Sequence, residues 1–317
     1  MKKILVTGAA GMIGSALCGR LKQGGEVIGV YHDALPPPDA DGIIWERADC
    51  TDTGLMARLC DRYAPDAVIH CAAVVHRKAG AVDAATYERV NVAATEGLAR
   101  AAASSNPAVL FVFLSSVAVY GDEGLPLPVS EGHPCNPADN YALSKRRAEM
   151  RLEGMAQRGE IAHVAIVRLA SVYDREMTVL LDRRVRGPGV FIRYGRGTQR
   201  ISALARPNLV DFVAWILKVP PEGCAVMNVC DERPYRFDEI IRVFKKGRDR
   251  ARPVIPVPLF AVRMASCVGG MVFKDRAGRL RSCSNKASSD MVFGNERMLK
   301  TGFRPLHTLE TVFSAEG

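Results

Sequence analysis

Short apolar runs alternate with helix-like stretches from Lys2 to about Ser171, and this alternation limits the fold more than any other feature of the chain. The runs are nearly continuous and rich in β-branched residues, which is typical of strands buried on both faces. They are KILVTG, EVIGVY, IIWERA, DAVIHCAA, AVLFVFLSS and HVAIVRLASVY. Between them lie helical patterns such as TGLMARLCDRYAP, VNVAATEGLARAAASS and NYALSKRRAEMRLEGMAQ. The sequence therefore predicts an α/β fold with a doubly wound parallel sheet.

The pattern becomes shorter and more irregular after residue 175. VFIRYG and AVMNVC are predicted as strands, and NLVDFVAWILK and FDEIIRVFKK as helices. A chain of 317 residues is long for a single core. We therefore expect a dinucleotide-type domain over residues 1–175 and a smaller C-terminal α/β lobe, mainly for substrate, over residues 176–317. Some segments of the second part are expected to return to the first.

Composition narrows the range of partners. No apolar run approaches the ~18 residues that span a bilayer, and the nine cysteines show no metal-type spacing, so we expect a soluble cytoplasmic protein without a metal or a membrane partner. The net charge is +9, with basic residues concentrated in Arg183–Arg206 and in Lys245–Arg252. The first cluster suits a diphosphate-bearing small molecule at least as well as a nucleic acid, and we expect no nucleic acid.

A glycine-rich turn, Gly8-Ala-Ala-Gly11-Met-Ile-Gly14, follows the first apolar run. Gly8 permits a tight turn, Gly11 lets the backbone approach a pyrophosphate, and Gly14 allows a helix to pack closely on a strand. The strand, turn and helix together favour a Rossmann-type dinucleotide site. The same letters resemble an export signal ending at Cys18. That reading is disfavoured because bulky Leu17 precedes the cysteine and cleavage would delete the first strand.

The residues after the second apolar run bear on which dinucleotide binds. An NAD site of this type carries a carboxylate at the end of this strand, where it holds the ribose hydroxyls. Here the position is Tyr31, followed by His32, and a carboxylate comes two residues late at Asp33. Either Asp33 serves NAD from a longer strand, or no carboxylate opposes a 2′-phosphate. We expect NAD or NADP, and the tyrosine at the strand end favours NADP.

A second group of residues indicates a catalytic site and consists of Ser116, Tyr141 and Lys145. Tyr141 and Lys145 are four residues apart on a predicted helix, so their side chains share a face. Tyrosine is a poor base at neutral pH, and a nearby ammonium favours its phenolate. Ser116 ends a buried strand, where open α/β sheets place their ligands. The three residues predict proton exchange at an alcohol or carbonyl oxygen while hydride moves at the carbon.

Eight motifs, in order, resemble those of the extended short-chain dehydrogenase/reductases of the NAD-dependent epimerase/dehydratase family. They are TGAAGMIG, ADCTD, VIHCAA, NVAAT, LSSVAVYG, YALSK, VRLASVY and NLVDFV. The resemblance extends over nearly the whole chain. It implies a Rossmann fold with a smaller lobe that holds the nucleotide of a nucleotide-diphosphate sugar.

The resemblance also implies the site residues. The catalytic set is Ser116, Tyr141 and Lys145. The expected cofactor-binding set is Gly8, Gly11, Met12, Ile13, Gly14, Tyr31, His32, Asp49, Cys50, Ala72, Ala73, Asn91, Tyr141, Lys145 and Ala170, with Asp49 and Cys50 at the adenine. The expected substrate-binding set is Ser116, Ser171, Arg200 and Arg281 (or Arg279), with Arg200 at the diphosphate.

Three departures from the family pattern bear on the substrate. The family's sugar dehydratases carry Thr-Asp-Glu where this chain has Ser116-Val117-Ala118, so the acid pair for 4,6-dehydration is missing. Ser171 replaces an asparagine that orients the sugar nucleotide, and Asp174-Arg175 replace the Gly-Pro that follows. Asn140 stands where a proline commonly precedes the catalytic tyrosine. Dehydration is not expected, and the substrate stays open.

These observations predict an NAD(P)-dependent epimerase or 4-keto reductase that acts at C4 of a nucleotide-diphosphate sugar. The sequence does not separate the two reactions. One alternative is a reductase of a hydrophobic alcohol or ketone, of steroid or flavonoid type, which would have no use for the arginine-rich segment. Another is a non-catalytic dinucleotide-binding sensor, which would not need Ser116, Tyr141 and Lys145 together. Family analogy suggests a homodimer formed through two helices.

Overall fold

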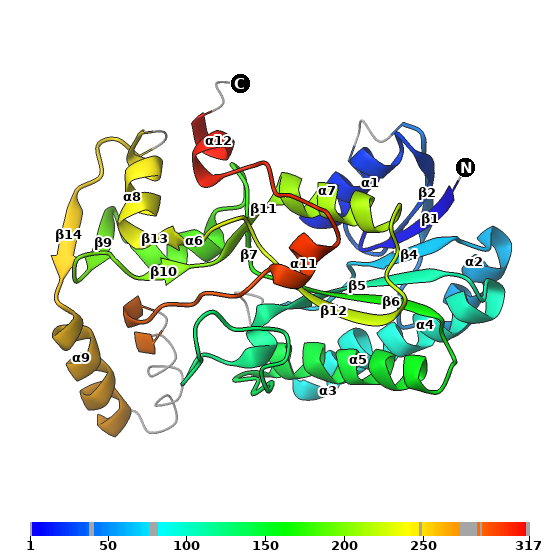
Figure 1. Ribbon diagram of the computed structural model, residues 1–317, viewed down its shortest axis with the longest axis horizontal. Coiled ribbons are helices and arrows are strands. Elements are labelled where there is room, and N and C mark those ends of the chain that lie inside the picture. The colour runs from blue at the N-terminus through cyan, green and yellow to red at the C-terminus, as the bar shows by residue number, and fades with distance from the viewer. Residues whose placement is uncertain are drawn as a thin grey trace.

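Seven parallel strands, counted within the described residues, form the central sheet of the larger body in this computed structural model (Figure 1). Their order is β12-β6-β5-β4-β1-β2-β3. They are β1 (Lys2–Thr7), β2 (Gly25–Tyr31), β3 (Ile43–Arg47), β4 (Ala67–His70), β5 (Leu110–Ser116), β6 (His163–Leu169) and β12 (Gly223–Val229). The structure describes residues 2–37, 41–75, 82–246, 249–272, 284–285 and 287–314.

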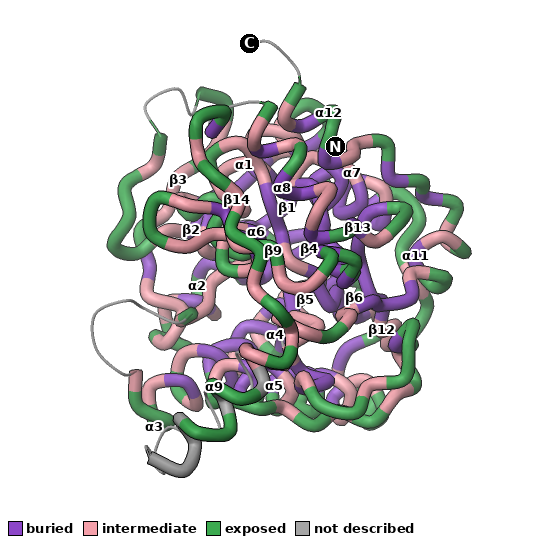
Figure 2. The backbone as a smooth tube through the Cα atoms, turned by 90° about the vertical axis from the view of Figure 1, so that its left-hand side faces the viewer, coloured by how far each residue is buried: buried purple, intermediate pink, exposed green. Residues whose placement is uncertain are grey.

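Helices cover both faces of this sheet, which confirms the predicted Rossmann-type fold (Figure 1). One face is covered by α1 (Met12–Leu21) and α7 (Arg206–Ile216), and the other by α2 (Thr53–Tyr63), α4 (Ala94–Ser105) and α5 (Asn140–Gln157). Alternate side chains of β1 enter different cores, because Ile4 and Val6 face α1 and α7 whereas Leu5 faces α2 and α4. The buried backbone in Figure 2 follows these strands and helix faces. Cys18, where the export signal would have ended, is buried in α1.

Two predicted elements differ from the observed ones. The run HVAIVRLASVY is predicted as one strand, but the chain leaves the large sheet at Ala170, whose N–H donates to the Val229 carbonyl at 3.0 Å. Beyond it β7 (Ser171–Tyr173) pairs with β11 (Ala203–Ala205) instead. The helix predicted from Val90 begins earlier, with α3 (Ala84–Tyr87) and a π-helical turn, η1 (Glu88–Ala93), before α4.

The smaller lobe combines short sheets with helices around its own core. Its remaining strands are β8 (Arg186–Gly187), β9 (Val190–Tyr194), β10 (Arg200–Ile201), β13 (Tyr235–Arg236) and β14 (Val254–Val257). Its helices include α6 (Val179–Val185), α8 (Phe237–Lys246), α9 (Leu259–Val272) and α12 (Leu309–Ser314). Helix α11 (Glu296–Lys300) precedes α12 in the chain and contacts β12 of the large sheet. Phe191, Phe237 and Phe244 are buried in the lobe core. In the described part of the chain, no helix is long and apolar enough to span a membrane.

The chain crosses between the two parts more than once. After the predicted boundary at residue 175, α7 packs on α1 and β12 pairs with β6 in the large sheet. The larger body is therefore completed by segments from the second half of the sequence. The division of cofactor and substrate binding between residues 1–175 and 176–317 stays a prediction.

Candidate active site

The glycine turn lies where the strand order of the large sheet reverses, between β1 and β4. Gly8 has φ +65°, and a Cβ atom on it would lie 2.8 Å from the backbone nitrogen of Ala72. A Cβ atom on Gly14 would lie 2.2 Å from the carbonyl oxygen of Gly8. The turn can therefore be built only with glycine at these two positions, and they let α1 and the segment after β4 approach the turn closely. Such a cradle at a switch point fits a dinucleotide pyrophosphate.

Ser116, Tyr141 and Lys145 come together at the carboxyl end of β5. The Ser116 and Tyr141 side chains are hydrogen-bonded to each other. Lys145 is buried one helical turn further along α5, where Nζ donates to the Leu114 carbonyl at 2.7 Å and lies 4.6 Å from the centre of the Phe113 ring. The structure therefore brings the predicted catalytic residues into one group, whereas their catalytic roles stay predictions.

The pKa of Tyr141 shifts in the direction opposite to the one expected from the sequence. Burial raises the pKa of Tyr141 to about 12, the nearby Asp139 carboxylate adds to the rise, and the hydrogen bond with Ser116 opposes it. Burial also lowers the pKa of Lys145 to about 8. The sequence predicts that Lys145 favours the phenolate, but in this structure burial of the hydroxyl has the largest effect on this pKa and raises it. In this structure Tyr141 is protonated at neutral pH and can donate a hydrogen bond.

His70, a buried histidine that the sequence analysis did not single out, connects Thr7 on β1 with Thr95 on α4. Thr7 Oγ1 lies 2.7 Å from His70 Nδ1, and His70 Nε2 lies 3.0 Å from Thr95 Oγ1. Because Thr95 itself donates to the Asn91 carbonyl, the contacts fit a neutral ring with its proton on Nε2. Burial lowers the pKa of His70 to about 3, and the nearby Lys145 contributes to the same shift. A lone histidine in the apolar run VIHCAA was the available signal.

Asn91 fixes the chain that follows β4. Its carboxamide accepts from the Val74 N–H at 2.8 Å and donates to the Val74 carbonyl at 3.0 Å. It also donates to Ser144 Oγ on α5 at 3.0 Å. These bonds hold the segment with Ala72 and Ala73 against the helix that carries Tyr141. The carboxamide is engaged with the protein, and its predicted contact with the cofactor stays a prediction.

Two carboxylates lie near the end of β2, the position that discriminates NAD from NADP. His32 Nδ1 lies 3.3 Å from Asp33 Oδ1, and His32 Nε2 lies 3.9 Å from Asp49 Oδ2. Tyr31 is the last residue of β2, and Cys50 follows Asp49. The fold therefore gathers the predicted adenine-end residues, including a carboxylate that is distant in sequence from β2.

A buried ion pair supports the strand that ends in Ser116. Arg168, on β6, donates to both carboxylate oxygens of Glu149, at 2.9 and 2.7 Å. Ser115 Oγ donates to the same carboxylate at 2.6 Å, and Arg168 also donates to the Tyr120 hydroxyl at 2.8 Å. The pair joins β5, α5 and β6 beneath the catalytic residues. The sequence signal for this pair is the charged Arg168 within the apolar run HVAIVRLA.

Of the predicted substrate-binding residues, the structure describes Ser116, Ser171 and Arg200 but not Arg281. Arg200 begins β10 at the surface, and its Nε and Nη2 atoms each lie 2.8 Å from Asp290 Oδ2. Ser171 is the first residue of β7, directly after Ala170. Arg281 and the alternative Arg279 lie outside the described residues. The expected binding of a diphosphate by Arg200 therefore stays a prediction, and in this structure an aspartate holds the guanidinium.

A further contact connects the smaller lobe with the glycine turn. Arg206, at the start of α7, forms an ion pair with Asp174, one of the two residues that replace the family's Gly-Pro. Arg206 Nη1 also donates to the Met12 carbonyl at 3.4 Å. The departure at Asp174 thus has a partner within this chain, which the sequence alone did not reveal.

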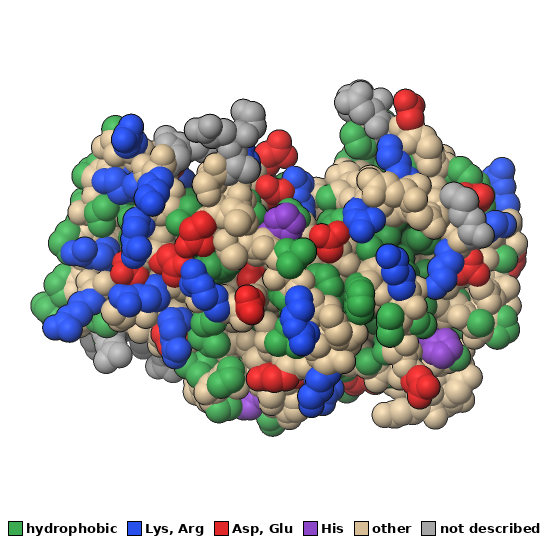
Figure 3. Space-filling model, turned by 45° about the horizontal axis from the view of Figure 1, so that its top comes forward, with side chains coloured by type: hydrophobic (Ala, Val, Ile, Leu, Met, Phe, Trp, Pro, Cys, Tyr) green, Lys and Arg blue, Asp and Glu red, His purple; other side chains and the backbone are tan. Residues whose placement is uncertain are grey.

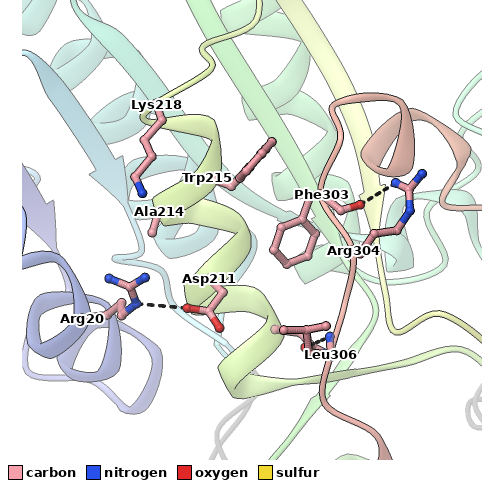
Figure 4. A pocket seen from close by; sticks show the side chains of 9 residues that line it. Arg20, Asp211, Ala214, Trp215, Lys218, Phe303, Arg304 and Leu306 are labelled. Atoms are coloured by element: carbon pink, nitrogen blue, oxygen red, sulfur yellow. Dashed lines mark hydrogen bonds and ion pairs between the residues drawn. The ribbon is translucent and has the colours of Figure 1, made fainter.

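A hollow of about 260 Å³ lies elsewhere, along the outer side of α7 (Figure 4). Trp215 and Phe303 face it, and Arg20 reaches across from α1 to Asp211 at 3.0 Å. None of the predicted cofactor or substrate residues lines this hollow. It is therefore separate from the candidate active site.

Three features of this structure define the short-chain dehydrogenase/reductase class of enzymes. They are the doubly wound sheet, the dinucleotide-type glycine turn, and the serine, tyrosine and lysine gathered at a strand end. Comparison with known proteins narrows this class. The chain belongs to the NAD dependent epimerase/dehydratase family, whose family model matches residues 4–230. It is an NAD-dependent enzyme of that type.

The relatives of this chain are mostly sugar epimerases and dehydratases. The UDP-glucose 4-epimerase of Vibrio cholerae is 28% identical over 274 residues, which cover 83% of this chain and 81% of that protein. The N-acetyl-alpha-D-glucosaminyl-diphospho-ditrans,octacis-undecaprenol 4-epimerase of Escherichia coli O157:H7 is 28% identical over 177 residues, or 54% of this chain and 52% of that protein.

Solved structures share the fold at lower identity. The Thermotoga maritima UDP-glucose 4-epimerase with UDP-glucose has a TM-score of 0.74 at 20% identity, covering 98% of this chain and 96% of that one. The Bacillus cereus UDP-glucuronic acid 4-epimerase, in complex with UDP-glucuronic acid and NAD, has a TM-score of 0.74 at 20% identity, covering 99% and 97%.

Proposed function

We propose that this enzyme is an NAD-dependent epimerase that acts at C4 of a nucleotide-diphosphate sugar. The observation that carries the proposal is the hydrogen-bonded pair of Ser116 and Tyr141 at the end of β5, beside the glycine turn. Relatives named as 4-epimerases support the C4 position. Val117 and Ala118 stand where the family's dehydratases have an acid pair, which argues against 4,6-dehydration.

In this proposal each catalytic residue has a separate task. Tyr141 exchanges a proton with the C4 oxygen of the sugar, donating it as a phenol and accepting it as a phenolate. Ser116 donates a hydrogen bond to the same oxygen and holds it beside the tyrosine. Lys145, fixed by Leu114 and Phe113, would hold the ribose next to the nicotinamide. NAD, when bound, supplies the hydride acceptor and donor at C4.

We infer that NAD rather than NADP is the cofactor. Asp33 and Asp49 both lie next to His32 at the end of β2, and carboxylates there repel a 2′-phosphate while accepting bonds from ribose hydroxyls. Related folds have been solved with NAD bound. The sequence favours NADP because Tyr31 stands at the strand end, but the fold brings a second carboxylate, Asp49, close to His32, and this favours NAD.

We also propose that Arg200 binds the diphosphate of the sugar nucleotide. The diphosphate would then replace Asp290 as the anionic partner of the guanidinium. The guanidinium is half exposed and already holds an anionic partner in two-point contact. A diphosphate offers more oxygens in the same geometry and more negative charge. UDP is the first nucleotide to test, because UDP-sugars are named for relatives and solved structures of this fold.

Replacement of Tyr141 by phenylalanine tests the proposed chemistry. We expect Tyr141→Phe to lose at least ~100-fold in turnover, because acid–base groups typically contribute this much, while NAD binding stays intact. The assay follows interconversion of UDP-glucose and UDP-galactose by the NAD-loaded enzyme. Tyr63→Phe, the same change on α2, is the control and should keep full activity.

Two results would contradict the proposal. Full turnover by Tyr141→Phe would exclude the tyrosine as the proton carrier. Stoichiometric consumption of reduced cofactor with a 4-keto sugar, without epimerisation, would identify a reductase instead.

A further inference from the structure

Five buried polar side chains form a series of hydrogen bonds between the glycine turn and α5, the helix that carries Tyr141. The members of this polar series are each at most 3% exposed, and they are Thr7, His70, Thr95, Asn91 and Ser144. Figure 3 shows charged side chains spread over the surface of one face, where water can satisfy them. The polar series has no such access to water, so each of its members needs a partner inside the protein.

The first half of the polar series begins beside the glycine turn. The Ala72 N–H, which packs against Gly8, donates to Thr7 Oγ1 at 3.4 Å. Thr7 Oγ1 lies 2.7 Å from His70 Nδ1, and His70 Nε2 lies 3.0 Å from Thr95 Oγ1. With the ring proton on Nε2, Thr7 donates to His70 and His70 donates to Thr95. His70 therefore carries the connection from β1 through β4 to α4.

The second half of the polar series reaches the residue that is proposed to exchange the proton. Thr95 donates to the Asn91 carbonyl at 2.8 Å, and the Asn91 carboxamide donates to Ser144 Oγ at 3.0 Å. Ser144 donates in turn to the Tyr141 carbonyl at 2.8 Å. Asn91 lies in the π-helical turn η1, and such turns are frequent at functional sites. Each link of the series is therefore donated in the direction of α5.

His70 also contacts the aromatic ring on which Lys145 lies. The His70 and Phe113 rings are stacked, with centroids 6.1 Å apart and an angle of 22° between their planes. Lys145 Nζ lies 4.6 Å from the centre of the same Phe113 ring. His70 is thus connected to Tyr141 by hydrogen bonds and to Lys145 by ring contacts.

We propose that His70 is a positioning residue of this enzyme, which fixes α5 relative to the glycine turn. Through the polar series it sets the position of the Tyr141 main chain, and through Phe113 it sets the position of Lys145. The proton-exchanging group and the site for the NAD pyrophosphate are then held in one frame, where a small displacement slows the reaction strongly. Apolar side chains could fill the same volume, so packing alone does not require the series, whereas a fully satisfied polar network specifies one arrangement. The inference rests on the proposed function for its catalytic readout.

Substitutions at Thr95 interrupt the polar series without changing a catalytic residue. We expect Thr95→Val to lower kcat for interconversion of UDP-glucose and UDP-galactose about 10- to 100-fold, with KM nearly unchanged, because it displaces a reacting group. Thr95→Ser, which keeps the hydroxyl, should recover most of this loss. His70→Phe, which keeps a ring against Phe113 but neither hydrogen bond, should lose at least as much as Thr95→Val. Ser105→Ala on the same helix removes a comparable bond, to the Ala102 carbonyl at 3.1 Å, and should leave kcat unchanged.

A second readout is independent of turnover. In proton NMR spectra, the buried His70 Nε2–H should give a slowly exchanging imidazole signal that is absent from His70→Asn. Thr95→Val should move this signal, because its acceptor is lost. Addition of NAD to the cofactor-free protein should also shift it, because the polar series begins beside the glycine turn.

Full turnover by Thr95→Val, or an equal loss in Thr95→Ser, would overturn the proposal. So would a His70 signal that NAD leaves unchanged. If Thr95→Val does not fold, Ser144→Ala takes its place, because it removes the last link and leaves His70 and its ring contacts intact. A wild-type enzyme that epimerises no UDP-sugar would contradict the proposed function instead, and the NMR signal would still decide whether His70 connects the two parts of the site.

Discussion

Lys145 carries an ammonium group in a buried position, above the Phe113 ring and bonded to the Leu114 carbonyl. Burial lowers its pKa from 10.5 to about 8. Below pH 8 both the folded and the unfolded chain hold this proton, but the unfolded chain holds it more tightly. The folded state is therefore destabilised at neutral pH, and the penalty disappears as the pH rises from about 8 to 10.5. Such a penalty is typical of groups kept for function.

Replacement of Lys145 by methionine should reveal this penalty. We expect Lys145→Met to raise the free energy of unfolding at pH 7 by about 1–3 kcal/mol, part of the burial penalty being offset by the lost bond to Leu114. The gain should shrink as the pH approaches 10, while epimerisation is lost at every pH. Urea unfolding at both pH values measures it, with exposed Lys218→Met as the control. A variant less stable than the wild type at pH 7 would show that the bond to Leu114 outweighs desolvation.

Three elements of the larger body depend on one buried ion pair. Glu149 on α5 and Arg168 on β6 are almost completely buried, and Ser115 on β5 donates to the same carboxylate. Burial opposes the charge of Arg168, but its bonds to Glu149 and Tyr120 hold its pKa above the usual range. A charge left alone in this place would be strongly unfavourable. The register of α5 against β5, and with it the approach of Tyr141 to Ser116, rests on this pair.

Neutralising Glu149 should therefore destabilise the fold far more than neutralising a nearby glutamate. We expect Glu149→Gln to lower the free energy of unfolding by about 2–4 kcal/mol, because Arg168 would remain buried without a compensating charge. Glu153→Gln, one turn further along α5 and bonded to Arg146 at 3.0 Å, should change it by less than about 1 kcal/mol. Urea titrations of the two variants measure the difference. Equal losses in both would contradict the role given to the buried pair.

Both parts of the molecule contribute to the proposed site. The catalytic residues lie on β5 and α5 of the larger body, whereas Arg200 lies on β10 of the smaller lobe, where Asp290 holds it. A sugar nucleotide bound by both parts would stabilise the folded chain as a whole. The homodimer suggested by family analogy is a separate feature of the whole molecule and stays a prediction.

UDP should raise the thermal midpoint of the protein. We expect a rise of several degrees at ~100-fold excess over its dissociation constant, since binding then adds about 2.7 kcal/mol. Arg200→Gln should remove most of the rise, and Asp290→Asn should strengthen binding by freeing the guanidinium. Arg236→Gln is the matched control, because Arg236 lies opposite Arg200 on β13 and also pairs with an aspartate. An undiminished rise in Arg200→Gln would contradict its contact with the diphosphate.

Local patterns in the sequence determine the strands, most helices and the glycine turn. An unbroken apolar run such as AVLFVFLSS can be satisfied only inside a covered sheet, and Gly8 and Gly14 meet backbone atoms where no Cβ fits. The spacing of Tyr141 and Lys145 follows from the helical period alone. Family and fold could therefore be predicted from these signals.

Only the tertiary structure decides features that depend on distant partners or on burial. His70 meets Thr7 63 residues away, and Arg200 meets Asp290 90 residues away, so neither contact leaves a local pattern. After β6 ends at Leu169, β7 pairs with β11, a strand from a distant part of the chain. The raised pKa of Tyr141 has the same origin, because desolvation is set by everything that packs around the hydroxyl.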